Sequence, residues 1–163
     1  MLNINELVLN NFAQCLERTD FFWTYKSLCE PNKNGIISLK KDEMITLLKN
    51  TKYKFKYDST QREFVYKLKL NTFDVKFILK SRTGWIIPYI IVDLIDQDNL
   101  YLISDSFDTL GEKFKTGYRE TIIINPWPQC VSIEEGKVII DKILIIFMDI
   151  EKALIDEFGM SSP

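Results

Sequence analysis

The feature that most constrains the fold is an alternation of apolar and charged side chains between residues 52 and 80. Aromatic residues alternate with lysines in residues 52–57, and the same period returns in 64–70 and 73–80. A period of two predicts strands with one buried face and one solvent face. Asp58-Ser59-Thr60 and Asn71 are typical turn sequences between these strands. Consecutive strands joined by short turns predict an antiparallel meander, with its aromatic side covered and its lysine side in water.

The next stretch, residues 85–95, is continuously apolar. This composition predicts a strand that is either central in the sheet or partly covered on both faces. Pro88 lies within it and cannot donate to a strand ladder, so we expect a bulge or an edge there. After the turn at 96–99, residues 100–103 are expected to extend the sheet.

Helical periodicity marks both ends of the chain. Residues 3–18 carry an amphipathic stripe with Asn3 as a candidate N-cap, and Asp20 is expected to cap a second, aromatic-rich helix. Ser38 is expected to start a third helix. A short helix is predicted from Asp105 or Ser106 to about residue 115.

The last helix is predicted to start at a capping box, Ser132 and Glu135, and to end at Gly159. Its first half is rich in β-branched residues, which are poor helix formers, so a strand over 138–147 is the alternative.

These elements predict one α+β domain spanning 1–163. It consists of N-terminal helices in 3–50, a sheet in 52–104 and a helical C-terminal part in 105–158. The expected architecture is a two-layer sandwich, an antiparallel meander sheet of four to five strands covered on one face by the N-terminal and C-terminal helices.

The composition argues against an enzyme. The chain has no histidine, and no phosphate-binding, dinucleotide-binding, hydrolase or EF-hand motif occurs. Three cysteines without a CxxC spacing indicate reduced thiols in the cytoplasm. No signal peptide and no apolar run long enough for a membrane span occurs. We therefore predict no catalytic residue, no metal and no cofactor; the alternative is a divalent cation held by Asp93, Asp96 and Asp98.

Charge is sorted along the chain. Residues 40–82 hold twelve Lys/Arg and five Asp/Glu, whereas residues 93–112 hold six carboxylates and no base. Carboxylates without neighbouring bases suit a decoy for a basic protein surface, although solubility and helix capping explain them too. The predicted partner surface consists of Asp96, Asp98, Asp105, Asp108, Glu112 and Trp127, the last as an anchor between two prolines.

The second half of the chain carries a recognisable layout. It contains Gly84-Trp85 with Pro88, Ser106-Phe107, Tyr118-Arg119, Pro126-Trp127-Pro128 and a capped last helix through residues 149–154. This layout resembles small bacterial immunity proteins that are encoded beside polymorphic or contact-dependent growth inhibition toxins. The resemblance implies a protein without catalytic residues that neutralises one cognate toxin domain by direct, stoichiometric binding.

A second hypothesis uses the lysines. Lysine rows at 52–56, 67–69 and 76–80 would lie side by side on one sheet face and could contact phosphates, giving a nucleic-acid-binding or regulatory module. Sheet-based RNA binders also place aromatics on that face, whereas here the aromatics have the opposite parity. We therefore expect a protein partner with a basic surface rather than a nucleic acid or a membrane. The sequence indicates no oligomeric state.

Overall fold

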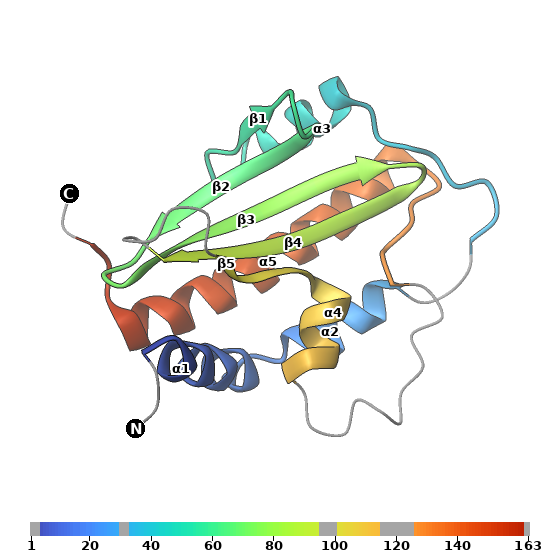
Figure 1. Ribbon diagram of the computed structural model, residues 1–163. Coiled ribbons are helices and arrows are strands. Elements are labelled where there is room, and N and C mark those ends of the chain that lie inside the picture. The colour runs from blue at the N-terminus through green and yellow to red at the C-terminus, as the bar shows by residue number, and fades with distance from the viewer. Residues whose placement is uncertain (1–3, 30–32, 95–100, 115–125, 162–163) are drawn as a thin grey trace.

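The computed structural model describes residues 4–29, 33–94, 101–114 and 126–161. Three helices come first: α1 (Ile4–Arg18), α2 (Phe21–Cys29) and α3 (Lys41–Leu48). Five strands follow: β1 (Lys56–Asp58), β2 (Glu63–Lys69), β3 (Phe73–Arg82), β4 (Trp85–Leu94) and β5 (Tyr101–Ser106). Helices α4 (Phe107–Phe114) and α5 (Ile133–Phe158) complete the chain. The predicted α+β architecture is confirmed (Figure 1).

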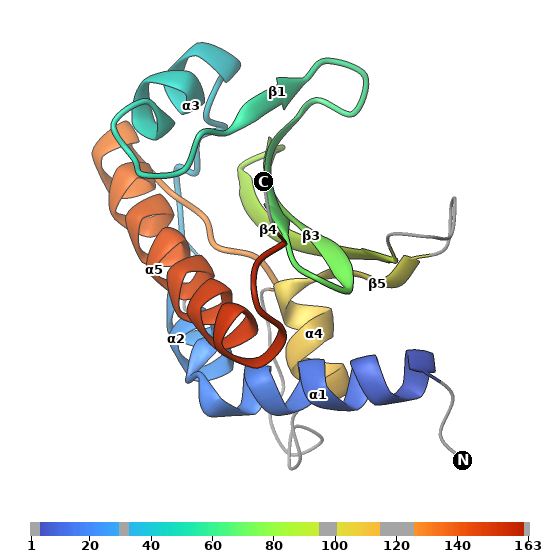
Figure 2. The same ribbon diagram turned by 90° about the vertical axis from the view of Figure 1, so that its left-hand side faces the viewer.

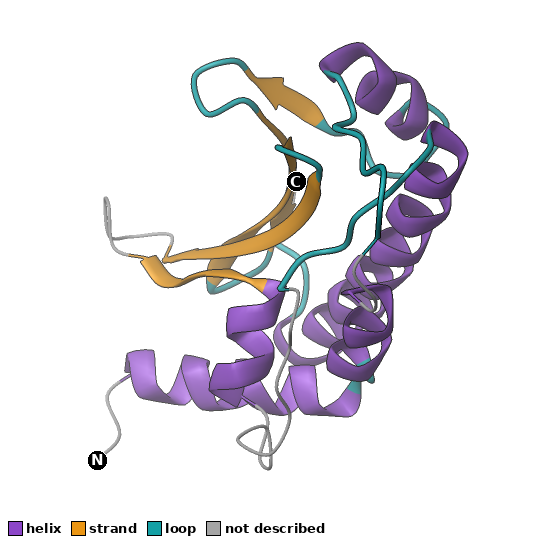
Figure 3. Ribbon diagram, turned by 90° about the vertical axis from the view of Figure 1, so that its right-hand side faces the viewer, coloured by secondary structure: helices purple, strands orange, loops and turns teal. Residues whose placement is uncertain are grey.

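The sheet is an open antiparallel meander whose spatial order, β1-β2-β3-β4-β5, is the order along the chain. All helices lie on one side of it, and the strands follow a curve whose concave side faces away from the helices (Figures 2 and 3). The alternation predicted that the aromatic and aliphatic residues of β3 lie on the covered face. They do: Phe73, Val75, Phe77 and Leu79 are fully buried.

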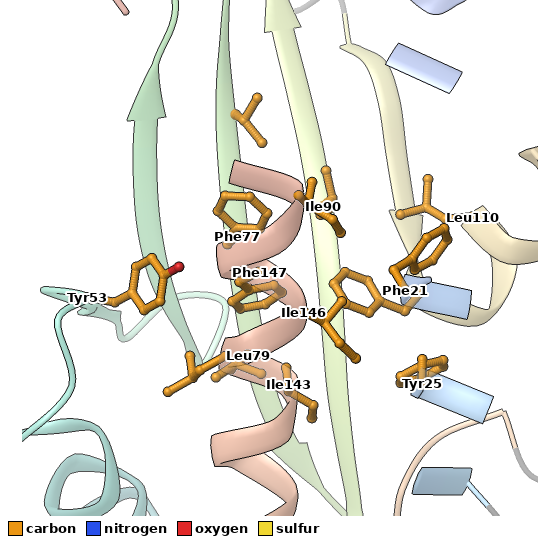
Figure 4. Packing of buried hydrophobic residues seen from close by; sticks show 14 of the residues in the cluster. Phe21, Tyr25, Tyr53, Phe77, Leu79, Ile90, Leu110, Ile143, Ile146 and Phe147 are labelled. Atoms are coloured by element: carbon orange, nitrogen blue, oxygen red, sulfur yellow. The ribbon is translucent and has the colours of Figure 1, made fainter. Parts of the chain in front are cut away.

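Helix α5 forms the centre of the core. The Phe147 ring lies 4.6 Å from the Phe77 ring on β3 and 5.4 Å from the Phe107 ring on α4, measured between centroids. Figure 4 shows Phe147, Ile146 and Ile143 of α5 between the sheet and the N-terminal helices. One helix thus joins the sheet to the helical layer.

The start and end of α5 match the predicted capping signals. Ser132 Oγ accepts a hydrogen bond from the Glu135 N–H at 3.1 Å, and Gly159 ends the helix with φ of +70°. The Glu135 carboxylate accepts a hydrogen bond from the Val131 N–H rather than from the Ser132 N–H of a standard capping box. The alternative strand over 138–147 is wrong, because burying the apolar stripe against the sheet outweighs weak β-branched helix propensity.

Two predicted boundaries differ from the structure, one because of a distant contact and the other because of a local turn. Helix α3 begins at Lys41 rather than Ser38, whose hydroxyl accepts the Gly84 N–H at 2.6 Å. Strand β1 is only three residues long. The residues before it form a turn in which the Thr51 N–H donates to the Leu48 carbonyl. Asn3 lies outside the described residues.

Pro88 lies in an interior strand at a place where one side is unpaired. Strand β4 pairs with β5 only from Tyr89 onward, and an isolated bridge joins Trp85 to Gln129. Alternate residues of a strand direct their N–H groups to the same side. The Ile86 N–H donates to the Pro128 carbonyl, so the proline nitrogen two residues later faces the gap between the two partners. The prediction of a local edge is confirmed in this form.

Candidate partner-binding surface

The acidic stretch occupies the β5 edge of the sheet and the helix that follows it. Asp105 lies in β5, Asp108 in the first turn of α4, and Glu112 in α4, where its side chain is not described. Asp96 and Asp98 lie outside the described residues. Of the predicted partner residues, the structure therefore brings Asp105 and Asp108 together at the junction of β5 and α4.

Local contacts hold these two carboxylates in place. The Asp105 side chain is 19% exposed, and its Oδ2 lies 3.5 Å from Nζ of Lys113 in the last turn of α4. Asp108 Oδ1 accepts a hydrogen bond from the Ser106 hydroxyl at the start of α4. Negative charge in a first helical turn is stabilised by the free N–H groups there. Both residues thus have a structural role in addition to any contact with a partner.

The remaining carboxylate of the stretch, Asp93, lies on the open face of the sheet. It is the penultimate residue of β4 and pairs with Lys76 of β3 at 2.7 Å. Two similar pairs join neighbouring strands on this face, Lys67 with Asp74 at 2.8 Å and Lys80 with Glu63 at 2.7 Å. The lysine face is therefore largely neutralised by its own carboxylates.

The open face also carries an apolar column, which the lysine alternation concealed. Its half-buried side chains on β4 are Trp85, Ile87, Tyr89 and Ile91. Tyr89 is opposite Ile78 of β3, and Ile78 is in turn opposite Val65 of β2. Ile78 is only 1% exposed, although no described helix lies over this face. Side chains converge on the concave side of a curved sheet, so the neighbouring strands enclose Ile78.

Trp127 lies at one end of this column. Its ring meets the Trp85 ring edge-to-face, with 5.8 Å between centroids. Its Nε1 is buried and has no hydrogen-bond partner among the described residues. The half-buried ring surface, rather than the N–H group, is what remains for a partner to contact.

The described residues contain no cluster of three or more His, Cys, Asp or Glu able to hold a metal ion. Cys15, Cys29 and Cys130 are free and buried, and burial raises the pKa of the Cys15 and Cys130 thiols. A buried thiol with a raised pKa is a poor nucleophile.

One buried polar cluster was not predicted from the sequence. Glu151 of α5 is 8% exposed and accepts hydrogen bonds from the Tyr53 hydroxyl at 3.1 Å and the Tyr66 hydroxyl at 2.9 Å, while Lys52 Nζ lies 3.1 Å away. Burial, and then Glu151, raise the pKa of Tyr53, and they raise that of Tyr66 to about 12. The only signal in the sequence is a glutamate next to the buried stripe of the last helix. These hydrogen bonds join α5 to the segment before β1 and to β2, so the cluster has a structural role.

The meander converts the order of charge along the chain into an order across the sheet. The basic region 40–82 supplies α3 and β1–β3, and the acidic region supplies the end of β4, strand β5 and α4. Once the sheet-face pairs are formed, five lysines on or beside α3 and β1 have no ion pair with another described residue: Lys40, Lys41, Lys49, Lys54 and Lys56. Asp42 and Glu43 of α3 and Asp58 of β1 have no ion pair with another described residue either, so this edge keeps an excess of two positive charges over these eight residues. At the opposite edge Asp105 is paired with Lys113, and Asp108 keeps its negative charge without an ion pair to another described residue.

Comparison with known protein families, curated proteins and solved structures found no match. None of the helices that the structure describes is long and apolar enough to cross a membrane.

Proposed function

We propose that this protein is an immunity protein, a non-enzymatic inhibitor that binds one cognate toxin domain directly and stoichiometrically. The observation that carries the proposal is the separation of charge between the two edges of the sheet. The carboxylate-rich edge, β5 with α4, is the proposed contact for a basic toxin surface. Toxins that act on nucleic acids have such surfaces, and carboxylates can occupy the positions where phosphates would sit.

Two further features support inhibition rather than catalysis. The chain has no histidine, and the two buried carboxylates among the described residues are both engaged: Glu151 by two tyrosine hydroxyls and a lysine, and Glu63 by Lys80. The alternative, nucleic-acid binding by the lysine face, receives less support because Lys67, Lys76 and Lys80 are paired with carboxylates. Neutralised lysines release few counterions when a phosphate backbone binds.

The direct test starts from the neighbouring gene, which we expect to encode a toxin domain immediately upstream. Co-expression with this protein should restore the growth of cells that produce the toxin domain, and the purified proteins should form a one-to-one complex. The proposal is wrong if no toxin domain is encoded there, or if the two purified proteins do not associate.

The contact surface is tested with a triple variant, D96S/D98S/D108S. Asp108 lies in the first turn of α4, where loss of one negative charge costs about 0.3–1 kcal/mol, so the fold should be retained. We expect the association rate constant at low salt to fall on the order of tenfold, with a weaker salt dependence, because electrostatic steering is lost.

A second triple variant, E17S/D149S/D156S, serves as the control. It changes the net charge of the protein by the same amount as the first, but at positions on α1 and α5. These three carboxylates are exposed and have no ion pair with another described residue. Equal association rates for the two triple variants would rule out the β5–α4 edge as the contact.

A further inference from the structure

A hollow of about 300 Å³ lies between α3 and the segment that leads into β1. Apolar side chains line much of it: Leu48 of α3 and Phe64 of β2 are buried, and Phe55 is half-buried. The volume is at the lower end of the range for small-molecule pockets, about 300–1,000 Å³, which are also mostly apolar. The hollow therefore has the size and lining to take one compact apolar group.

Three lysines, Lys49, Lys52 and Lys54, line the same hollow, and none of the described carboxylates does. Lys49 and Lys54 are exposed and form no ion pair with another described residue. Lys52 is paired with Glu151, yet its side chain is 56% exposed and its ammonium has three donors. Like charges around one hollow repel one another, and a bound anion would relieve that repulsion.

The nearest buried carboxylate is directed elsewhere. Both oxygens of Glu151 accept hydrogen bonds, Oε2 from the Tyr53 hydroxyl and the Lys52 ammonium, and Oε1 from the Tyr66 hydroxyl. Tyr53 and Lys52 themselves line the hollow. Glu151 thus holds two lining side chains in position, and its charge is balanced by the donors that it holds.

We propose that this hollow binds a small organic anion, a compact aromatic or short acyl group that carries a phosphate or carboxylate. The apolar part lies on Leu48, Phe55 and Phe64, and the ammonium groups of Lys49 and Lys54 hold the oxyanion. The site is at the basic edge of the sheet, opposite β5, so it is independent of the proposed toxin contact.

The test compares three probes: 1-naphthyl phosphate, 1-naphthol and inorganic phosphate. Calorimetry gives the dissociation constants, and amide chemical shifts of residues 51–55 report where each probe binds. We expect 1-naphthyl phosphate to bind at least tenfold more tightly than either of the other two, because only it uses both the apolar lining and the lysines. Added salt should weaken its binding.

The matched variants are K49Q/K54Q and, as a control, K69Q/K142Q, which removes two exposed lysines away from the hollow. The first should raise the dissociation constant of 1-naphthyl phosphate at least fivefold, and the control should change it less than twofold. All four lysines are exposed, so both variants should fold, which circular dichroism verifies.

Three results would overturn the proposal. One is equal affinity for 1-naphthol and 1-naphthyl phosphate, and another is equal affinity of the two lysine variants. The third is tighter binding of a short single-stranded RNA than of 1-naphthyl phosphate, together with weaker RNA binding by K49Q/K54Q. That result would assign these lysines to a polynucleotide. The toxin-binding experiments are unaffected by each of these results.

Discussion

Replacing Glu151 by leucine should lower the free energy of unfolding by about 2–4 kcal/mol. Leucine keeps helix propensity and much of the side-chain volume but accepts no hydrogen bond. The Tyr53 hydroxyl, on a residue that is 4% exposed, would lose its acceptor, at a cost of about 1–3 kcal/mol. The half-buried Tyr66 would lose less because water can reach it. Lys52, with a side chain 56% exposed, contributes at most about 1 kcal/mol.

Urea unfolding followed by circular dichroism measures this loss. With an m-value of about 2 kcal/mol/M, the midpoint should fall by roughly 1–2 M while the m-value stays constant. The decisive comparison is the triple variant E151L/Y53F/Y66F. Replacing the carboxylate and both tyrosine hydroxyls by apolar groups of similar shape is close to neutral, and Lys52, whose side chain is 56% exposed, stays hydrated, so the triple variant should recover most of the lost stability. A triple variant no more stable than E151L would refute the assignment of the loss to orphaned hydroxyls.

Two further predictions test the packing and the titration of the core. The raised pKa values of Tyr53 and Tyr66 contribute stability that is fully present below about pH 10 and falls as the pH rises above it; the Tyr66 contribution is lost through about pH 12, and that of Tyr53 is lost at higher pH. Urea midpoints of the wild type should therefore fall more steeply between pH 10 and 12 than those of Y53F/Y66F, and parallel curves would contradict this. In G111A the new Cβ would lie 2.0 Å from the Phe22 ring, a clash expected to cost about 1–3 kcal/mol. In G136A the nearest atom is a leucine methyl at 3.0 Å, so thermal melting should show a lower midpoint for G111A than for G136A.

The parts of the fold that could be predicted are those whose signals are local. The alternation in residues 64–80 predicted β2 and β3 because both strands have one face buried under α5. The stripe from Ile139 to Leu154, with the Ser132 cap, predicted α5. In each case the periodicity of burial is written in consecutive residues, and the meander needs no long-range pairing.

The parts that could not be predicted depend on contacts between distant residues. Ser38 has the chemistry of a helix cap, but its hydroxyl accepts the Gly84 N–H, and α3 begins later. Tyr53 alternates with lysines like a strand residue, yet it is turned toward Glu151, ninety-eight positions away. Periodicity describes one element at a time, so it cannot reveal a bond between two of them.

The partner surface shows the same limit in its charges. Lys76 and Asp93 belong to regions of opposite sign in the sequence, but the antiparallel register of β3 and β4 places them within 2.7 Å of each other. Pairs with this exposure contribute about 0–1 kcal/mol to stability. These pairs have a larger effect on the electrostatic field, because each pair neutralises one positive and one negative charge on the open face.

Part of the charge that remains without an ion pair among the described residues lies at the two edges of the sheet. Lys40, Lys41, Lys49, Lys54 and Lys56 outnumber Asp42, Glu43 and Asp58 around α3 and β1, while Asp108 lies at the junction of β5 and α4, beside the Asp105–Lys113 pair. A meander keeps sequence order in space, so a chain that sorts its charges by position acquires a field directed across its sheet. Such a field orients an approaching charged partner before contact, whichever side chains later form the interface. Its sign at β5 favours a basic partner there, and its sign at β1 favours an anion in the hollow beside α3.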